Sequence, residues 1–540
     1  MLSKLIEFSL KSKFFIILLV SAMVGFGIYA LTQIPIGAVP DITNNQVQVI
    51  TTSRNLSTTD VEQFITYPVE LEMVNLPGVK EIRSVSKFGL SVVTIVFEDD
   101  LGTYLPRQLI AEKLKSAAEK IPSGFGTPQM GPITTGLGEI YQYTLETKPG
   151  YEDEYDATEL RTIQDWIVRR QLSGIPGVVE INTWGGYLKE YEVSINSKRL
   201  QANNISVSEV FQALENNNSI AGGSYIEKNQ EAYFIRGEGL LKSLKEIENI
   251  SVSMRGNQPV FIKDIAEVGY GYARRFGAIT GNGEGEKVLG QVMMLKDADS
   301  KKVIDAVKLR ISEIEKSLPE GVYINGFLDR SELIQRTTST IAENLLIGFL
   351  VVSLIVILLI GDWRSGLIIA SIIPLSFVCA ISLMYVFGID ANLMSLGALD
   401  FGIIIDGAVI IVEFVAFKLW QRSNEFSEKS STEISKLKNQ ITLNGASKMM
   451  NSAIFGQLII FIVFIPILSL SGVEGKMFKP MALTFSFALI GAMILCFTWV
   501  PVACSLILKP KPDSTSNIST KLLNGAKRLY LPSIKWALRH

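Results

Sequence analysis

The stretch Asp400-Phe-Gly-Ile-Ile-Ile-Asp406-Gly-Ala-Val-Ile-Ile-Val-Glu413 places three carboxyl groups inside an apolar segment that is long enough to cross a lipid bilayer. A charged side chain at the bilayer centre costs about 2.5–3.5 kcal/mol on insertion scales, so such residues are rare in spans and mark functional sites. A carboxyl group that can be neutral or charged in mid-membrane is what a proton carrier needs. The sequence therefore predicts a proton relay formed by Asp400, Asp406 and Glu413.

The three carboxyl groups are not equivalent on a helix. At about 100° per residue, Asp406 and Glu413 fall within about 20° of one face, and they are stacked roughly 10 Å apart along the axis. Asp400 lies about 120° from Asp406, nearer the helix start. The alternative is that Asp400 caps the helix and that Glu413 reaches the interface at its other end. Small residues that suit close helix packing stand in the same segment: Gly402, Gly407 and Ala408.

The composition is typical of an integral membrane protein with a large soluble part, because 48% of the 540 residues are hydrophobic and 19% are charged. A net charge of -2 leaves no basic footprint for nucleic acid. All three cysteines fall in apolar segments, so we expect no disulfide framework. The only histidine is His540, which excludes a histidine-based metal site. No Walker motif, nucleophile elbow or zincin motif occurs, so we do not expect an enzyme.

Apolar runs predict six membrane spans. The first, Phe14–Thr32, is longer than the apolar h-region of a typical signal peptide and lacks a clear small-x-small cleavage site, so we favour a transmembrane anchor. The other spans are expected at residues 341–360, 366–388, 395–419, 450–471 and 481–507. Basic residues concentrate in the loops that six spans would place on one side. The positive-inside rule therefore predicts that both termini are cytoplasmic and that residues 33–338 lie outside.

Residues 33–338 show alternating strand and amphipathic-helix patterns. The order β-α-β-β-α-β is that of the ferredoxin-like unit, and it occurs twice. Leu76-Pro-Gly-Val-Lys-Glu-Ile82 and Ile175-Pro-Gly-Val-Val-Glu-Ile181 mark the same helix-to-strand junction in each cycle, which indicates a duplicated domain. In the second cycle, we expect the strand Val178–Thr183 to pair with Leu188–Ile195.

Residues 184–273 interrupt the second cycle and are expected to form an inserted subdomain. A glycine-rich turn is predicted within it at Gly222–Tyr225. Where the cycle resumes, Gly281-Asn-Gly-Glu-Gly285 resembles a phosphate-binding loop only superficially, because no helix N-terminus follows it. A hairpin turn is therefore favoured there.

Four stretches carry a resemblance to the resistance-nodulation-division (RND) superfamily of proton-driven exporters, and specifically to its heavy-metal efflux branch. They are Ile36-Gly-Ala-Val-Pro-Asp-Ile-Thr-Asn-Asn-Gln-Val-Gln-Val49, Gly136-Leu-Gly-Glu-Ile-Tyr-Gln-Tyr143, Thr162-Ile-Gln-Asp-Trp-Ile-Val-Arg-Arg170, and Asp400 to Glu413. The similarity covers all 540 residues and corresponds to the N-terminal half of such a pump. Pro532–His540 also resembles the lead-in Leu5–Lys13, so we expect half of an internally duplicated transporter, either truncated or made as a separate piece.

The resemblance implies an α-helical bundle of six transmembrane helices and an α+β periplasmic part. The periplasmic part would consist of two ferredoxin-like βαββαβ porter subdomains and an inserted docking subdomain. The expected segments are a lead-in and first helix at 1–32, a first porter subdomain at 33–135, a second porter subdomain at 136–183 and 274–330, a docking subdomain at 184–273, helices two to six at 331–508, and a cytoplasmic linker with the start of a missing second half at 509–540.

The resemblance also implies an activity, which is proton-driven export of divalent heavy-metal cations. The Asp-Phe-Gly…Asp-Gly-Ala form resembles the cobalt–zinc–cadmium(–nickel) type, and oxygen or nitrogen ligands suit such ions. The metal is cargo and the proton is the coupling ion, so no cofactor is expected. The relay Asp400, Asp406 and Glu413 would lie on the fourth span. Glu139 is the candidate metal ligand, with a solvated glutamate at a strand start as the alternative.

The resemblance further implies partners and location. The pump would be a homotrimer in the bacterial inner membrane, working with a periplasmic adaptor protein and an outer-membrane channel. The basic partner of the relay, a lysine, and most of the substrate cleft would lie in the C-terminal half. Two other functions remain open: export of drugs or lipids by a member of the same superfamily, and a membrane-anchored assembly or sensor protein without flux.

Overall fold

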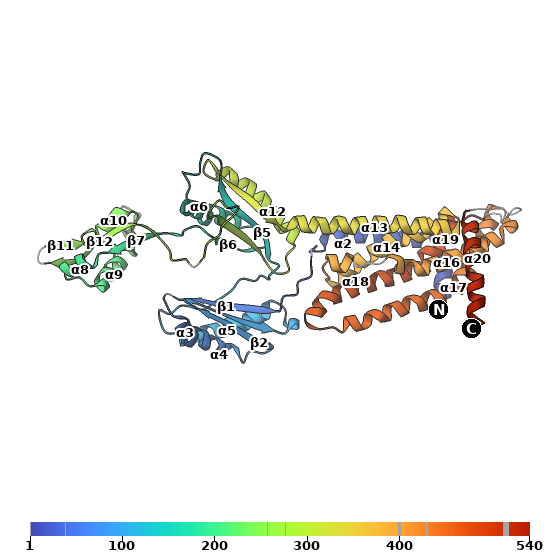
Figure 1. Ribbon diagram of the computed structural model, residues 1–540, viewed down its shortest axis with the longest axis horizontal. Helices are drawn as coiled ribbons and strands as arrows, with labels where there is room; N and C mark the ends of the chain where they lie inside the picture. The colour runs from blue at the N-terminus through green and yellow to red at the C-terminus, as the bar shows by residue number, and fades with distance from the viewer. Residues whose placement is uncertain are drawn as a thin grey trace. The chain divides into compact units, whose positions relative to one another are not determined.

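The computed structural model describes residues 2–37, 39–53, 55–255, 258–275, 277–397, 401–426, 430–510 and 518–539. The chain forms two compact units (Figure 1). The first comprises Met1–Ile140, Met293–Ala306 and Asp329–His540, and it holds the apolar helices and one α/β sheet. The second comprises Tyr141–Val292 and Val307–Leu328, and it holds most of a second sheet together with the insertion.

Within the described residues, five helices are long and apolar enough to cross a membrane, and they lie in α2 (Lys13–Gln33), α13 (Arg330–Ile360), α14 (Trp363–Phe387), α17 (Ser431–Leu468) and α18 (Gly472–Phe497). Another helix, α16 (Phe401–Gln421), is 21 residues long and carries Asp406, Glu413 and Lys418 within an apolar sequence. The helices pack through one large cluster of buried apolar side chains, which the short N-terminal helix α1 (Leu2–Lys11) joins.

The last predicted span, 481–507, is wrong as a single helix. Helix α18 ends at Phe497, and α19 (Trp499–Ile507) begins after Thr498, whose backbone is distorted to φ -112° and ψ -70°. Pro501 explains the break, because its ring nitrogen has no hydrogen to bond the carbonyl of Phe497.

The fifth predicted span, 450–471, is part of a longer helix, because α17 begins at Ser431. A capping box between Ser430 and Glu433 starts this helix ahead of the apolar run. Two further helices flank the bundle segments, namely α15 (Leu393–Gly397) and α20 (Ile518–Ala537).

The first sheet has the strand order β2-β3-β1-β4. Its strands are β1 (Gln46–Thr52), β2 (Val79–Lys87), β3 (Leu90–Phe97) and β4 (Gln129–Met130). The covering helices run from α3 (Thr58–Val61) through α4 (Tyr67–Met73), and then α5 (Tyr104–Lys120). Alternating residues of β1 and β3, such as Val49 and Val93, meet Ile65 and Ile110 of the helices in one buried core.

The second sheet repeats this topology. Its order β14-β5-β13-β6 places the fourth, first, third and second strands of the cycle side by side, as in the first sheet read from β4. The identical order supports the predicted duplication. The strands are β5 (Glu139–Thr147), β6 (Val178–Trp184), β13 (Val288–Met294) and β14 (Val322–Asp329), and the helices are α6 (Ala157–Ile163), α7 (Arg169–Leu172) and α12 (Ser300–Ile314).

The predicted pairing of Val178–Thr183 with Leu188–Ile195 is wrong. Strand β6 bonds β13, whereas β7 (Lys189–Ile195) pairs antiparallel with β12 (Ala266–Tyr272). Gly185 provides the physical reason, because its φ of 74° and its close approach to the Lys287 carbonyl turn the chain out of the sheet. Strands β7 and β12 therefore form the two-stranded stem of the insertion.

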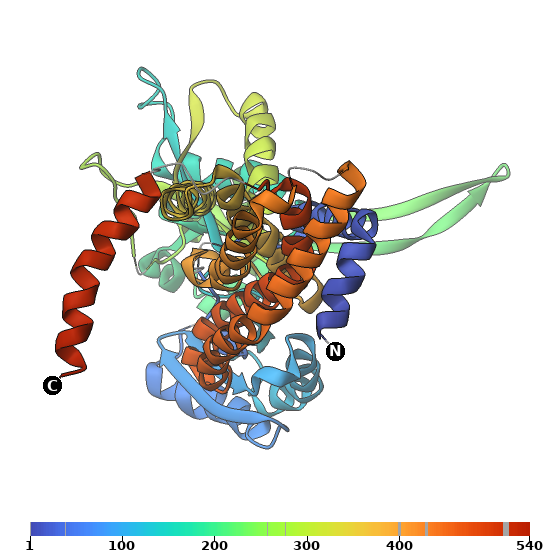
Figure 2. The same ribbon diagram turned by 90° about the vertical axis from the view of Figure 1, so that its right-hand side faces the viewer.

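The insertion carries a long hairpin of β8 (Ser219–Lys228) and β9 (Glu231–Gly239) (Figure 2). The predicted turn at Gly222–Tyr225 is wrong, because these residues lie within β8, where the register shifts. The turn falls instead on Asn229 and Gln230, at φ 54° and 65°. The remaining elements are α8 (Ser197–Ala202), α9 (Val207–Asn216), α10 (Leu244–Glu248), β10 (Ser251–Arg255), β11 (Gln258–Phe261) and α11 (Ile262–Ile265).

The hairpin turn predicted at Gly281–Gly285 is confirmed. Thr280 and Glu286 form an antiparallel bridge around it, and the Glu284 amide donates to the carbonyl of Gly281 at 3.0 Å. No phosphate-loop helix follows, since the next element is strand β13.

Candidate functional site

The two described carboxyl groups of α16 lie on one face of that helix. Asp406 and Glu413 are both exposed, whereas Ala408, Ile411 and Val415 on the other side are buried in the bundle. The apolar face of α16 therefore packs against the other helices of this chain, and the acidic face points away from them. Asp400 lies outside the described residues.

The small residues of α16 divide in the same way. A Cβ at Gly407 would stand 2.9 Å from Gln457 Nε2 and 3.3 Å from Cys496 Sγ, so a side chain there would have to displace the Gln457 amide, and glycine suits this close contact with α17 and α18. Ala408 is fully buried, at 0% exposure. Gly402 lies on the exposed side of the helix.

Gln457 was not predicted, and it is an unusual neighbour for α16. Its side chain is buried, and neither amide atom has a hydrogen-bond partner within the described part of the chain. Two hydroxyl groups of the same helix, those of Thr442 and Ser447, share this state. The available signal was a glutamine inside an apolar span. A buried polar group without a partner is costly, and Gln457 places one against Gly407 at the α16–α17 contact.

Glu139 begins β5 and is half-buried. The positive charge of Arg330 faces it, and the Arg330 guanidinium also donates to the carbonyl of Leu137. No group of three or more His, Cys, Asp or Glu side chains that could hold a metal ion occurs among the described residues. Glu139 therefore stands beside a cation rather than in a carboxylate cluster.

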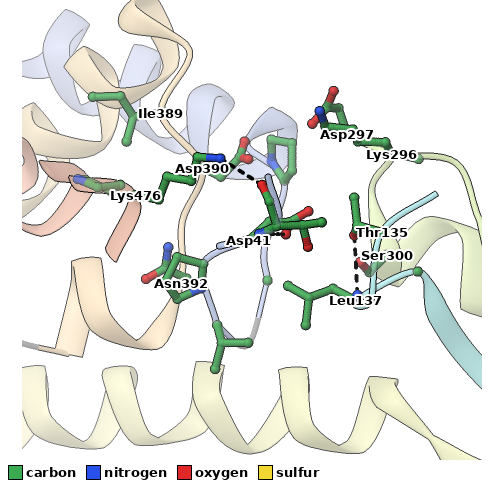
Figure 3. Close-up of a pocket in the computed structure, with 18 of the residues that line it drawn as sticks. Asp41, Thr135, Leu137, Lys296, Asp297, Ser300, Ile389, Asp390, Asn392 and Lys476 are labelled. Atoms are coloured by element: carbon green, nitrogen blue, oxygen red, sulfur yellow. Dashed lines mark hydrogen bonds between the residues drawn. The ribbon is translucent and has the colours of Figure 1, made fainter. Parts of the chain in front are cut away.

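A cavity of about 800 Å³ lies at the end of the bundle in the first unit (Figure 3). Its charged lining includes Asp41, Asp297, Asp390, Lys296 and Lys476. Burial raises the pKa of the Asp390 carboxyl, and the negative charge of Asp297 raises it further. The lining thus mixes both signs of charge.

The linker that follows α2 forms one wall of this cavity. The Gly37 amide donates to the carbonyl of Ala391 at 2.8 Å, and the Ala391 amide donates to that of Pro35 at 3.1 Å. This short parallel bridge fixes the linker to the connection between α14 and α15. The cavity could not be predicted from the sequence, because its lining residues come from distant parts of the chain.

Comparison with known proteins identifies the family to which this chain belongs. Residues 5–540 match the AcrB/AcrD/AcrF family. The cation efflux system protein CzcA of Alcaligenes sp. (strain CT14) is 43% identical over 542 residues, which cover 100% of this chain and 50% of that protein. The nickel and cobalt resistance protein CnrA of Cupriavidus metallidurans is 36% identical, covering 100% of this chain and 52% of that protein.

A solved structure shows the same fold. The crystal structure of a heavy metal efflux pump (crystal form I) aligns with a TM-score of 0.81 and 31% identity, covering 92% of this chain and 48% of that one. The chain spans about half the length of the curated relatives it matches, as expected for half of an RND pump. The chain belongs to the AcrB/AcrD/AcrF family of RND transporters, and its relatives there include heavy-metal efflux proteins.

Proposed function

We propose that this chain is the N-terminal half of a proton-driven exporter of divalent heavy-metal cations of the zinc, cobalt, cadmium and nickel class. The observation that carries the proposal is the arrangement of α16. Asp406 and Glu413 share the exposed face of this helix, whose other face packs against apolar helices, and relatives of the chain are named for cation efflux and for nickel and cobalt resistance.

Protonation of Asp406 and Glu413 would drive the cycle. A carboxylate on the acidic face of α16 requires a polar or charged surface opposite it, whereas a protonated carboxyl group tolerates an apolar one. Proton binding and release therefore change which packing of α16 is favoured. Each proton that moves inward supplies about 2.3 kcal/mol per 100 mV of membrane potential.

The proposal also includes a location and partners. The chain would lie in the bacterial inner membrane with both termini cytoplasmic and its α/β subdomains in the periplasm. It would act as a homotrimer with a periplasmic adaptor and an outer-membrane channel, and Glu139 would contact the metal cargo. The asymmetry of α16, with one face packed and one acidic face exposed, supports a second helical half that covers the acidic face.

Metal resistance of a strain carrying Asp406→Asn at the native locus tests the proposal. We expect the variant to lose resistance to zinc, cobalt and cadmium while its membrane level stays unchanged. Glu425→Gln, which removes an exposed carboxyl group just beyond α16, is the matched control and should keep full resistance. Resistance retained in Asp406→Asn would overturn the proposal.

A further inference from the structure

Lys476, near the start of α18, holds the base of the first sheet by two contacts. Its ammonium group donates to Asp99 Oδ1 at 2.7 Å and to the carbonyl oxygen of Thr43 at 2.8 Å. Asp99 opens the short turn that follows β3, and Thr43 lies in the linker that leads into β1. One side chain of the helical bundle therefore binds both the linker that enters β1 and the turn that follows β3.

These two chain segments are fixed to each other. The Phe97 amide donates to the carbonyl of Asn45 at 2.8 Å. The Asn45 side-chain amide, which is only 5% exposed, donates to the carbonyls of Glu98 and Gly102 at 2.9 and 2.8 Å. Strands β1 and β3 are the two central strands of the sheet. A displacement of Lys476 is therefore passed to the centre of the sheet and not to a loose loop.

The far part of α18 touches the relay helix. Cys496 stands 3.3 Å from where a Cβ of Gly407 would lie, next to Asp406 in the sequence. At about 1.5 Å per residue, Lys476 and Cys496 are roughly 30 Å apart along this one helix. Helix α18 thus connects the relay helix to the base of the sheet directly.

Pro480 lies between these two ends. As a proline inside α18, it cannot donate a backbone hydrogen bond to the carbonyl of Lys476. The first turns of α18 are therefore held less firmly by the helix itself. Their position depends correspondingly more on the Lys476 contacts with Asp99 and Thr43.

We propose that Lys476 is a positioning residue that transmits movement of α18 to the first sheet, through a joint with Asp99 and Thr43 that stays closed during transport. The proposal rests on the proposed export function. An ion pair with this degree of exposure, 22% for Lys476 and 48% for Asp99, adds little to stability. The joint is therefore expected to matter for transport far more than for folding.

A reversible chemical link tests the joint. Asp99→Cys and Lys476→Cys are combined, and zinc uptake is measured in inverted membrane vesicles with a proton gradient. A short bifunctional methanethiosulfonate replaces the ion pair by a covalent bridge, and its monofunctional analogue modifies both thiols without linking them. All rates are referred to wild type treated in the same way, which controls for the native cysteines.

We expect the unlinked pair to transport at least about fivefold more slowly than wild type at equal protein level. The bifunctional reagent should restore at least half of the wild-type rate, the monofunctional reagent should not, and a reducing agent should abolish the recovery. A wild-type rate in the unlinked pair, or no recovery on linking, would overturn the joint while leaving the export function intact. Absence of zinc uptake in wild type would overturn the proposed function and the joint with it.

Discussion

Gly407 of α16 lies directly against the side-chain amide of Gln457 of α17, since a Cβ at Gly407 would stand 2.9 Å from Gln457 Nε2. The Gln457 side chain is 4% exposed, and its amide has no hydrogen-bond partner among the described residues. Leaving such a group unpaired costs about 1–3 kcal/mol. The protein is therefore less stable at this contact, beside the helix that carries Asp406, than it would be with an apolar side chain in place of Gln457.

Replacing this amide should stabilise the protein. Gln457→Leu is expected to raise the apparent Tm in detergent by about 2–4 °C, because an apolar side chain of similar size removes the unpaired polar atoms. Gln440→Leu, at an exposed position of the same helix, is the control and should leave the Tm unchanged. A lower Tm in Gln457→Leu would show that the amide has a bonding partner in the folded protein.

Alanine substitutions at Gly185 and Gly283 allow the cost of a positive φ to be measured separately from the cost of a steric clash. Gly185 and Gly283 have nearly the same φ, 74° and 72°. A Cβ at Gly185 would stand 2.1 Å from the carbonyl oxygen of Lys287, whereas a Cβ at Gly283 would meet no atom within 4 Å. We expect Gly283→Ala to destabilise the second unit by about 1–2 kcal/mol, and Gly185→Ala by about 3 kcal/mol or more.

Limited proteolysis of residues 141–328 measures this difference. Cleavage should be much faster in Gly185→Ala than in Gly283→Ala. Equal cleavage rates would show that the chain does not need the close approach at Gly185 to leave the sheet.

The Asp99–Lys476 pair predicts a pH-dependent contribution to stability. Burial raises the pKa of the Asp99 carboxyl, but the hydrogen bond and positive charge of Lys476, together with smaller contributions from the Asn45 amide and the charge of Lys80, outweigh burial, so the pKa is lowered overall. Such a group stabilises the fold above its unfolded pKa, near 3.9, and the stabilisation is lost as the pH falls through the folded pKa.

The apparent Tm of wild type and Asp99→Asn measures this contribution across pH. The difference should be constant from about pH 5 to pH 7 and should shrink below about pH 4. The neighbouring, exposed Asp100 provides the control variant Asp100→Asn. A difference that grows as the pH falls would contradict the assigned ion pair.

Glu139 is expected to affect cargo binding and not the proton step. Glu139→Gln should raise the zinc concentration that gives half-maximal transport by about threefold to tenfold, with the maximal rate unchanged, because one ligand of moderate strength is lost. The effect should be modest, since Arg330 already faces this carboxyl group. An unchanged zinc dependence would show that Glu139 does not contact the metal and is only the first residue of strand β5.

The repeating patterns of the chain were sufficient to predict its main elements. Apolar runs located the helices α2, α13 and α14, and the twofold β-α-β-β-α-β order predicted two sheets of the same topology. These features depend on local hydrophobic periodicity, which the sequence displays directly. The break at Thr498 also had a local signal, because Pro501 stands in the sequence.

The contacts that shape the candidate sites had no such signal. The pairing of β7 with β12 joins the two ends of the insertion. Lys476 contacts Asp99 although the two residues are 377 positions apart in the sequence. Local patterns determine which element forms, but they do not determine which distant element it meets. Asp406 is conspicuous in the sequence because it is a carboxyl group in an apolar segment, whereas Lys476 is distinguished only by its neighbours in space.

Proton movement linked to zinc tests the central claim most directly. The purified protein is reconstituted in liposomes that contain a pH-sensitive dye, and zinc is added under a fixed membrane potential. Wild type and Glu425→Gln should show zinc-dependent proton movement, and a folded Asp406→Asn variant should show none. Zinc-dependent proton movement of wild-type size in Asp406→Asn would contradict the proton relay on α16.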